Sequence, residues 1–370
     1  MTRISKSLLA LTLAAGFSIS AQAWGPAGHQ IVGAIADKKL SGTPTGQKIA
    51  TLLDGFTLEK ASVIADEIKG WDKKGADDPG IFHYSARPRI DAQLRDFWKA
   101  NPPTKDHQSA VPSHHWFHYT DVPLVHNEKY AEGKAGRGEW DIVHMINYCV
   151  AVLQGDKPEE NERKITKAVA IILLAHYVGD IHEPMHVGAM YFDAEGKITD
   201  PDKDSAALAD QGGNTISLQL PADGAIPAAT KKLHGFWDND TVMALLPQFP
   251  PAMEKNERRA RMDAGRTDLV NRFAKEEPKN WKSPANVDPK NYAEAWANEI
   301  LPFAREAHDR LTIAPAHAQQ QDDGMVAVTT AQPKTSPDGI SYGQWSARVA
   351  DDELHKAGWR LADLLTRIVK

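Results

Sequence analysis

The sequence contains a single cysteine, Cys149, so the chain cannot form an intramolecular disulfide. The chain also has fewer basic than acidic residues: it contains 43 Lys and Arg and 49 Asp and Glu, which gives a formal net charge of −6. This balance argues against a basic groove that holds nucleic acid by phosphate contacts alone. After residue 23 no apolar run reaches the roughly 20 residues of a membrane span. We therefore expect no stable membrane association, and stability that comes from packing and bound metal.

The first 23 residues have the features of a secretion signal. A basic start is followed by an apolar run, and Ala21-Gln22-Ala23 forms a small-x-small cleavage site. The pattern predicts export to the periplasm or the extracellular space. Cleavage there would make Trp24 the first residue of the mature chain, with a free amine.

Apolar residues at spacings of three and four predict a mostly helical, all-α fold for residues 24–370, which we interpret as one domain. The predicted helices are 30–39, 45–53, 58–69, 141–153, 165–181, 292–311 and 346–369. In residues 215–220 polar and apolar side chains alternate after a Gly-Gly turn, and this pattern predicts a short β-hairpin. Residues 72–112 and 314–339 lack a sustained period, so we expect long loops or insertions there.

Several histidines and aspartates have spacings that suit metal ligands. His176 with Asp180, and His234 with Asp238, stand four residues apart, on one face of a helix if these segments are helical. His186 follows a proline that should end the first of these helices. The free amine and carbonyl of Trp24, together with His29, offer further donors. Because no cysteine accompanies them, the donors favour catalytic zinc over a closed structural site.

Six ordered motifs resemble one known family, the zinc-dependent single-strand-specific nucleases and 3'-nucleotidases of the S1/P1 type from fungi, plants and bacteria. The resemblance suggests a secreted bacterial member. The motifs are WGxxGH at Trp24, ADEIK at 65–69, HYTD at 118–121, HYVGDIHEPMH at 176–186, GGN at 212–214 and LHGFWD at 233–238.

The resemblance implies a helical fold that holds three zinc ions. The residues that match the first zinc site are Asp66, His118, His176 and Asp180. Those that match the second are Trp24, through its amine and carbonyl, His29 and a bridging Asp180. Those that match the third are His186, His234 and Asp238.

The same resemblance implies an endonuclease that hydrolyses single-stranded DNA and RNA to 5'-phosphorylated products, with 3'-nucleotidase activity and a metal-bound water as nucleophile. Asp66 would also orient that water. Tyr119 would stack on a nucleobase and Asp121 would bind the base edge. Lys69 and Asn214 would contact phosphate. Single-stranded nucleic acid and nucleotides are the expected substrates of a monomer with no obligate protein partner.

Two other functions remain open at this stage. A phospholipase C on the same three-zinc fold would share the metal chemistry, and a non-catalytic periplasmic zinc binder would share the ligands. Among the histidines, His114 and His115 compete with His118 for the motif register. His182 lies two residues beyond Asp180, on another helical face, and we interpret it as structural.

Overall fold

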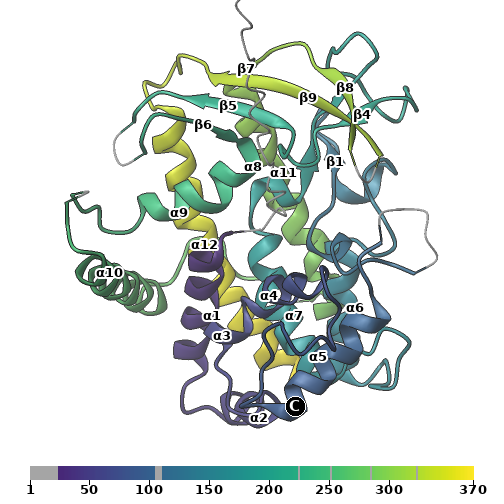
Figure 1. The fold of residues 1–370 in the computed structure, drawn as a ribbon, viewed down its shortest axis with the longest axis vertical. Coiled ribbons are helices and arrows are strands. Elements are labelled where there is room, and N and C mark those ends of the chain that lie inside the picture. Colours follow the sequence, from purple (N-terminus) through teal and green to yellow (C-terminus); the bar gives the residue numbers. More distant parts are fainter. Residues whose placement is uncertain (1–23, 105–110, 224–225, 251, 284–285, 322–323) are drawn as a thin grey trace, which may run out of the picture.

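The computed structural model describes residues 24–104, 111–223, 226–250, 252–283, 286–321 and 324–370. The predicted secretion signal, residues 1–23, lies outside the described residues. The described chain is mostly helical, with the larger β-sheet gathered at one end (Figure 1). None of its described helices combines the length and apolar character that crossing a bilayer requires.

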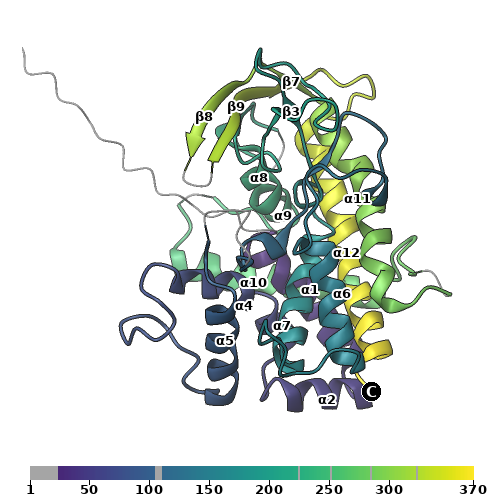
Figure 2. The ribbon, with the colours of Figure 1, turned by 90° about the vertical axis from the view of Figure 1, so that its right-hand side faces the viewer.

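Long helices form the body of the molecule, and α7 lies among them (Figures 1 and 2). They are α1 (Pro26–Leu40), α6 (Ile142–Gln154), α7 (Lys167–Asp180), α11 (Tyr292–Asp309) and α12 (Tyr342–Ile368). Every residue of α7 from Ala168 to Asp180 is buried, as expected for a helix that is apolar on all sides. α1 and α12 pack very closely, because a Cβ at Gly358 would lie 2.6 Å from the Cβ of Ile35.

Local sequence explains where these helices begin. The side chains of Asp141, Thr166 and Ser341 each accept a hydrogen bond from a backbone N–H in the first turn of α6, α7 and α12. Such caps satisfy donors that a helix start leaves without partners. α1 instead starts with Pro26, whose missing N–H costs nothing at that position.

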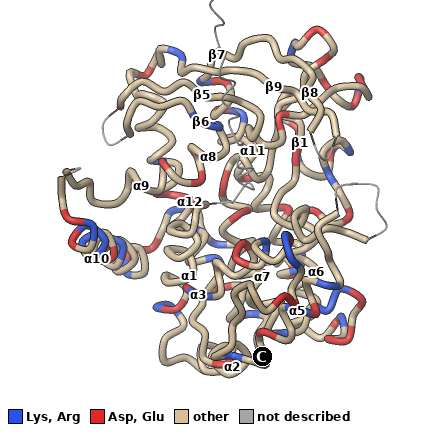
Figure 3. Tube along the Cα trace, viewed as in Figure 1, with Lys and Arg blue, Asp and Glu red and all other residues tan. Residues whose placement is uncertain are grey.

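Shorter helices complete the helical part. They are α2 (Pro44–Leu52), α3 (Leu58–Ala61), α4 (Ile64–Glu67), α5 (Pro88–Ala100), α8 (Leu233–Gly235), α9 (Thr241–Ala244) and α10 (Lys255–Lys275). The 3₁₀ turns are η1 (Ile68–Trp71), η2 (Trp116–His118), η3 (Tyr130–Glu132), η4 (Pro184–His186) and η6 (Pro289–Asn291), and η5 (Phe236–Asp240) is π-helical. α10 lies at one side of the body, with Lys and Arg alternating with Asp and Glu along it (Figure 3).

A five-stranded sheet forms among the described residues, in the order β6-β5-β9-β7 with β8 paired to β9. Its strands are β5 (Ile216–Leu220), β6 (Ala229–Lys232), β7 (Leu311–Ile313), β8 (His317–Gln321) and β9 (Gly324–Pro333). β5 pairs with β9 in parallel, with Ile216 opposite Thr329, and the other pairs are antiparallel. Two short pairs join β1 (Val122–Pro123) to β2 (Gly188–Ala189), and β3 (Tyr191–Phe192) to β4 (Leu208–Ala209).

The predicted mostly helical fold is confirmed, and so is the hairpin after the Gly-Gly turn, formed by β5 and β6. Three local predictions were wrong. The expected helix 58–69 is broken into α3, α4 and η1, which leaves the carbonyl of Ser62 free to accept a hydrogen bond from His176. Residues 72–112 contain α5 and residues 314–339 contain β8 and β9, so neither range is a loop throughout, and whether these ranges are insertions stays a prediction.

Buried apolar side chains form two clusters, and the predicted metal ligands lie on segments that contribute to one or the other. The larger cluster joins α1, α6, α7 and α12 and includes Trp24. The smaller one lies under the five-stranded sheet and includes Met185, Leu233 and Trp237. His186 follows Met185 directly and His234 follows Leu233, so packing of the apolar neighbour positions each histidine.

Candidate metal centre

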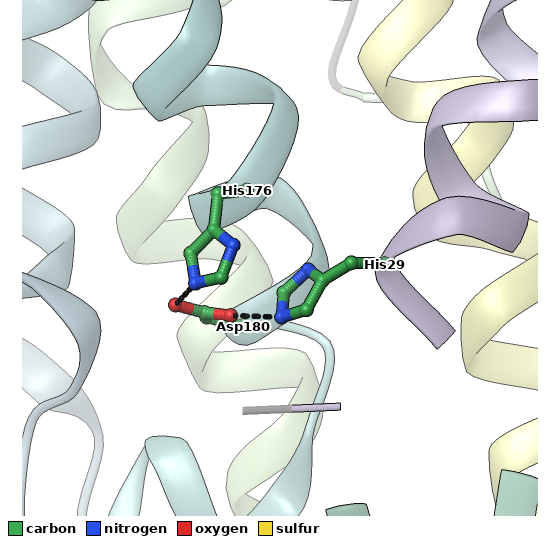
Figure 4. Close-up of side chains that lie close together, drawn as sticks. All are labelled: His29, His176 and Asp180. Carbon is green, nitrogen blue, oxygen red and sulfur yellow. Dashed lines mark ion pairs between the residues drawn. The ribbon is translucent and has the colours of Figure 1, made fainter. Parts of the chain in front are cut away.

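The centre of the site is Asp180, in the last turn of α7, which lies between His176 of the same helix and His29 of α1 (Figure 4). Its Oδ1 is 3.2 Å from Nε2 of His29, and its Oδ2 is 3.3 Å from Nε2 of His176. All three side chains are fully buried. A Cβ at Gly179 would lie 2.9 Å from Nδ1 of His29, so glycine at this position leaves room for the ring.

A second group shares His176 and adds Asp66 of α4 and His118 of η2. Nδ1 of His118 is 3.0 Å from Nε2 of His176 and 3.0 Å from Oδ2 of Asp180. Oδ1 of Asp66 is 3.7 Å from the same nitrogen of His176. Ligands around a tetrahedral zinc ion stand roughly 3.4 Å apart, given bonds of about 2.0–2.1 Å. These donor atoms therefore have the mutual spacing that one zinc ion requires.

The third group consists of His186 of η4, His234 of α8 and Asp238 of η5. Nε2 of His234 is 3.6 Å from Oδ2 of Asp238, and the rings of the two histidines are 4.7 Å apart. The four-residue spacing places both residues on one face only if the segment is helical, and in the structure His234 lies in α8 and Asp238 in the π-helical turn η5. Such turns are rare and frequently occur at functional sites.

Three of these histidines direct one ring nitrogen at a backbone carbonyl. Nδ1 of His176 donates to Ser62 O at 2.6 Å. Nδ1 of His186 donates to His118 O, and Nδ1 of His234 donates to Gly212 O, both at 2.8 Å. Since a carbonyl can only accept, the proton must be on Nδ1, which leaves each Nε2 as a lone-pair donor toward the group. Metal-binding histidines in proteins are oriented in the same way.

Several buried polar atoms of the site have no hydrogen-bond partner in the part of the chain that the structure describes. They are both ring nitrogens of His29, Oδ1 of Asp180, Nε2 of His186 and of His234, and Oδ1 of Asp238. His29 and Asp180 approach each other closely, but not in hydrogen-bonding orientation. Each such atom costs about 1–3 kcal/mol. They fall in two of the three groups, and their presence there fits the binding of cations.

Charge leads to the same conclusion. Burial and repulsion between carboxylates hold the pKa of Asp238 well above its usual range, and burial does the same for Glu183. Burial lowers the pKa of His186 to about 4 and that of His234 to about 3, so both rings stay neutral. The neutral imidazoles are ready to bind a metal, whereas the raised pKa values of Asp238 and Glu183 show that their anionic forms are unfavourable here until a cation offsets the charge.

Glu183 is a member of this site that the sequence did not single out. It is fully buried, both its carboxylate oxygens lack hydrogen-bond partners in the described chain, and one lies 3.9 Å from Nε2 of His186. An indication was available in the motif itself. A glutamate between Asp180 and His186, in a run that is otherwise almost wholly apolar or ligand-like, rarely becomes buried without a cation nearby.

Trp24 lies near His29 in the structure, and its role as a ligand stays a prediction. Its side chain is fully buried, and a Cβ at Gly179 would lie 3.8 Å from its ring as well as close to His29. The N–H of Gly25 donates to the carbonyl of Asp238 at 2.7 Å. The backbone at the start of the described chain is therefore attached to the π-helical turn that carries a candidate ligand.

Asp66 has a second partner that the sequence did not predict. Nζ of Lys69 donates to its Oδ1 at 2.7 Å, and both side chains are nearly buried. Although burial opposes ionisation, Lys69 and the nearby histidines hold the pKa of Asp66 well below its usual range. Asp66 therefore stays ionised and can orient a water molecule, but it is a weak proton acceptor.

Tyr119 and Asp121 line one pocket of about 570 Å³, whose wall also contains Trp116, Trp140 and Arg137. β9 contributes Met325 and Val326 to the same pocket. Burial raises the pKa of Asp121 to about 7, helped by the neighbouring carboxylates of Asp210 and Asp141. Near neutral pH this carboxyl group can therefore either donate or accept a hydrogen bond.

The remaining predicted residues have partners within the protein. The amide of Asn214 donates to the carbonyl of Gln211 at 3.0 Å, which stabilises its own turn. His182 donates to Val178 O and accepts from Arg360, which supports its structural interpretation. His114 and His115 contact Asp72 rather than the three groups.

Residues 24–370 match the sequence model of the family described as S1/P1 Nuclease. Among curated proteins, the chain is similar to three from Arabidopsis thaliana. Endonuclease 1 is 24% identical over 144 residues, which cover 36% of this chain and 39% of that protein. Endonuclease 4 is 24% identical over 148 residues, with 37% and 42% covered, and Endonuclease 2 is 22% identical over 136 residues, with 35% and 39% covered. The matched region spans about two fifths of the length of these relatives.

Proposed function

Because this chain belongs to the S1/P1 nuclease family, we propose that it hydrolyses phosphodiester bonds within single-stranded DNA and RNA. The products carry 5'-phosphates, and 3'-nucleotides are substrates as well. The observation that carries the proposal is the presence of three buried His/Asp groups, two of which contain buried atoms that lack hydrogen-bond partners among the described residues.

We assign three zinc ions to these residues. One would be held by Asp66, His118, His176 and Asp180, and one by His186, His234 and Asp238. The remaining ion would be held by His29, Asp180 and the amine and carbonyl of Trp24, the last two being proposed from the family resemblance. Bound zinc lowers the pKa of a water ligand to supply the nucleophile and stabilises the charge on the phosphodiester and the leaving oxygen.

The protein's own groups position the substrate and the water. Asp66, kept ionised by Lys69, accepts a hydrogen bond from the attacking water and aims it. Tyr119 stacks on a nucleobase and Asp121 binds its edge, which requires a base free of its duplex. This geometry favours single strands. Phosphate contacts from Lys69 and Asn214 stay predictions, since both side chains already have partners within the protein.

The substrate preference can be tested with one oligonucleotide presented as a single strand and as a duplex. We expect the single strand to be cleaved at least tenfold faster, since about 1–3 kcal/mol of stacking per base is available only to unpaired bases. Ligation of the fragments should detect 5'-phosphates. Fragments that carry 3'-phosphates would contradict the proposed reaction.

Tyr119→Ala separates this function from a phospholipase C. We expect this variant to raise KM for single-stranded DNA roughly tenfold by loss of one stacking contact. Phe82→Ala is the matched control, because Phe82 is an exposed aromatic residue that does not line this pocket. Cleavage of phosphatidylcholine by the wild type, with equal losses on lipid and DNA in Tyr119→Ala, would favour the phospholipase.

We also propose that the chain is exported and that removal of residues 1–23 completes the second zinc site. A protein that retains Ala23 before Trp24 would have an amide where the amine ligand is needed. We expect it to lose one zinc equivalent and roughly ten- to a hundredfold in turnover, the range seen when a ligand environment is damaged. Cleavage of a tag can release one protein that begins at Trp24 and another that begins at Ala23. The two can be compared by metal analysis and steady-state kinetics. Equal zinc content and turnover would exclude the terminal amine as a ligand.

A further inference from the structure

A fourth cluster of possible ligands, outside the three groups, joins Asp72 to His114 and His115. Nε2 of His115 is 2.6 Å from Oδ2 of Asp72, and Nε2 of His114 is 3.2 Å from Oδ1. The two rings are 4.6 Å apart and nearly perpendicular. Two imidazoles therefore approach the two oxygens of one carboxylate from adjacent positions in the chain.

The surroundings of the cluster resemble those of a metal ligand set. The indole N–H of Trp98 donates to Oδ1 of Asp72 at 2.8 Å and holds the carboxylate in place. His114 is 1% exposed, and its Nδ1 has no hydrogen-bond partner in the described part of the protein. Burial lowers the pKa of this ring to about 4, so it is neutral and can donate a lone pair. Nε2 of His114 is the atom beside the carboxylate, and with the proton on Nδ1 its lone pair would face Oδ1 of Asp72, an arrangement that a cation between them would stabilise.

We propose that Asp72, His114 and His115 bind one further divalent cation of the zinc class. Two imidazole nitrogens and one carboxylate oxygen select zinc and its neighbours cobalt and nickel over magnesium or calcium, which prefer oxygen ligands throughout. The side chains of His115 and Asp72 are 37% and 18% exposed, so the cation can be reached from solvent. Three protein ligands leave a fourth position for water.

The position of the cluster indicates what the cation does. Asp72 follows η1 directly, and His114 and His115 come shortly before and at the start of η2, so a cation there ties together the two ends of the segment that contains α5. The chain has no second cysteine with which to close this loop covalently. The two ends also carry predicted metal-site residues: His118 is the last residue of η2, and Asp66 and Lys69 lie within two turns before Asp72. By joining the two ends, the cation stabilises the backbone that positions these residues.

The test is a zinc count on the processed protein after dialysis against buffered zinc. We expect the wild type to hold one equivalent more than His115→Gln, which removes a half-exposed ligand without disturbing the core. His126→Gln is the matched control, because His126 is an exposed histidine paired with one carboxylate, that of Asp200, at 3.1 Å. It should bind as much zinc as the wild type.

Asp72→Asn is a second variant to measure, and its amide oxygen can still accept the hydrogen bond from Trp98. We expect this variant also to lose one equivalent and to show a smaller rise in melting temperature than the wild type when zinc is added back. Cobalt substitution should give the same difference of one equivalent by its visible absorption. Because the count is a difference between variants, it does not depend on nuclease activity. Equal counts in the wild type, His115→Gln and Asp72→Asn would overturn the site.

Discussion

Asp180→Asn should reduce hydrolysis of single-stranded DNA roughly a thousandfold, a loss of about 4 kcal/mol in transition-state stabilisation. Asp180 provides one oxygen to each of two neighbouring groups, with His29 on one side and His118 and His176 on the other. An amide keeps the shape but removes the negative charge and one acceptor. Both adjacent cation sites would therefore be weakened by a single substitution.

His182→Ala is the control variant whose activity should be compared with that of Asp180→Asn. His182 is also fully buried and only two residues away, but its ring bonds Val178 and Arg360 instead of the three groups. Its loss leaves a buried guanidinium donor without an acceptor and costs about 1–3 kcal/mol of stability. At a temperature where both variants are folded, His182→Ala should stay within about tenfold of the wild type, a loss below roughly 1.4 kcal/mol. The opposite ranking would overturn the assignment of Asp180.

Chelation should abolish activity and lower the melting temperature together. Asp66, Asp180, Glu183 and Asp238 are all buried, and without cations only Lys69 and the histidines stabilise the anionic form of these carboxyl groups. A ligand present at a thousandfold its Kd stabilises the folded state by about 4 kcal/mol, and each kcal/mol shifts the melting temperature by about 2–4 °C in a large domain. We therefore expect a fall of at least about 10 °C.

The measurement pairs calorimetry with hydrolysis of denatured DNA before and after removal of metal. Addition of zinc should restore both properties, whereas addition of magnesium should restore neither, since imidazole ligands favour zinc. His126→Gln should behave as the wild type in both assays, because its surface ion pair lies outside the site. Hydrolysis that survives complete chelation would rule out a metal mechanism.

The candidate ligands could be predicted from the sequence because short-range spacing encodes them. His176 and Asp180 occupy successive turns of one helix, and His186 follows the proline that ends it, so their proximity needs little tertiary information. Motif order supplied the longer-range partners. Glu183 was missed because its spacing matches no ligand pattern, and the apolar residues around it were the only indication that it would be buried. The Lys69–Asp66 pair was missed because a lysine near a carboxylate on a helix is usually solvated.

The fold was harder to predict where tertiary pairing decides the structure. α10 has only Leu269, Val270 and Phe273 buried, so its apolar period is too short to stand out from its charges. β9 takes its place by pairing with β5, more than a hundred residues earlier, and no local pattern specifies that partner. The break near Ser62 depends on a hydrogen bond from α7. Each of these features requires contacts that a single segment does not encode.

The burial of α7 from Ala168 to Asp180 bears on how this protein can be engineered. Residues 168–180 present no side chain to solvent, so no position there can accept a label, a charge or a bulkier group without moving its neighbours. The β8–β9 hairpin is the better place for labels and for substitutions that change substrate specificity. It projects from the body (Figure 2), and its β9 strand lines the pocket that contains Tyr119.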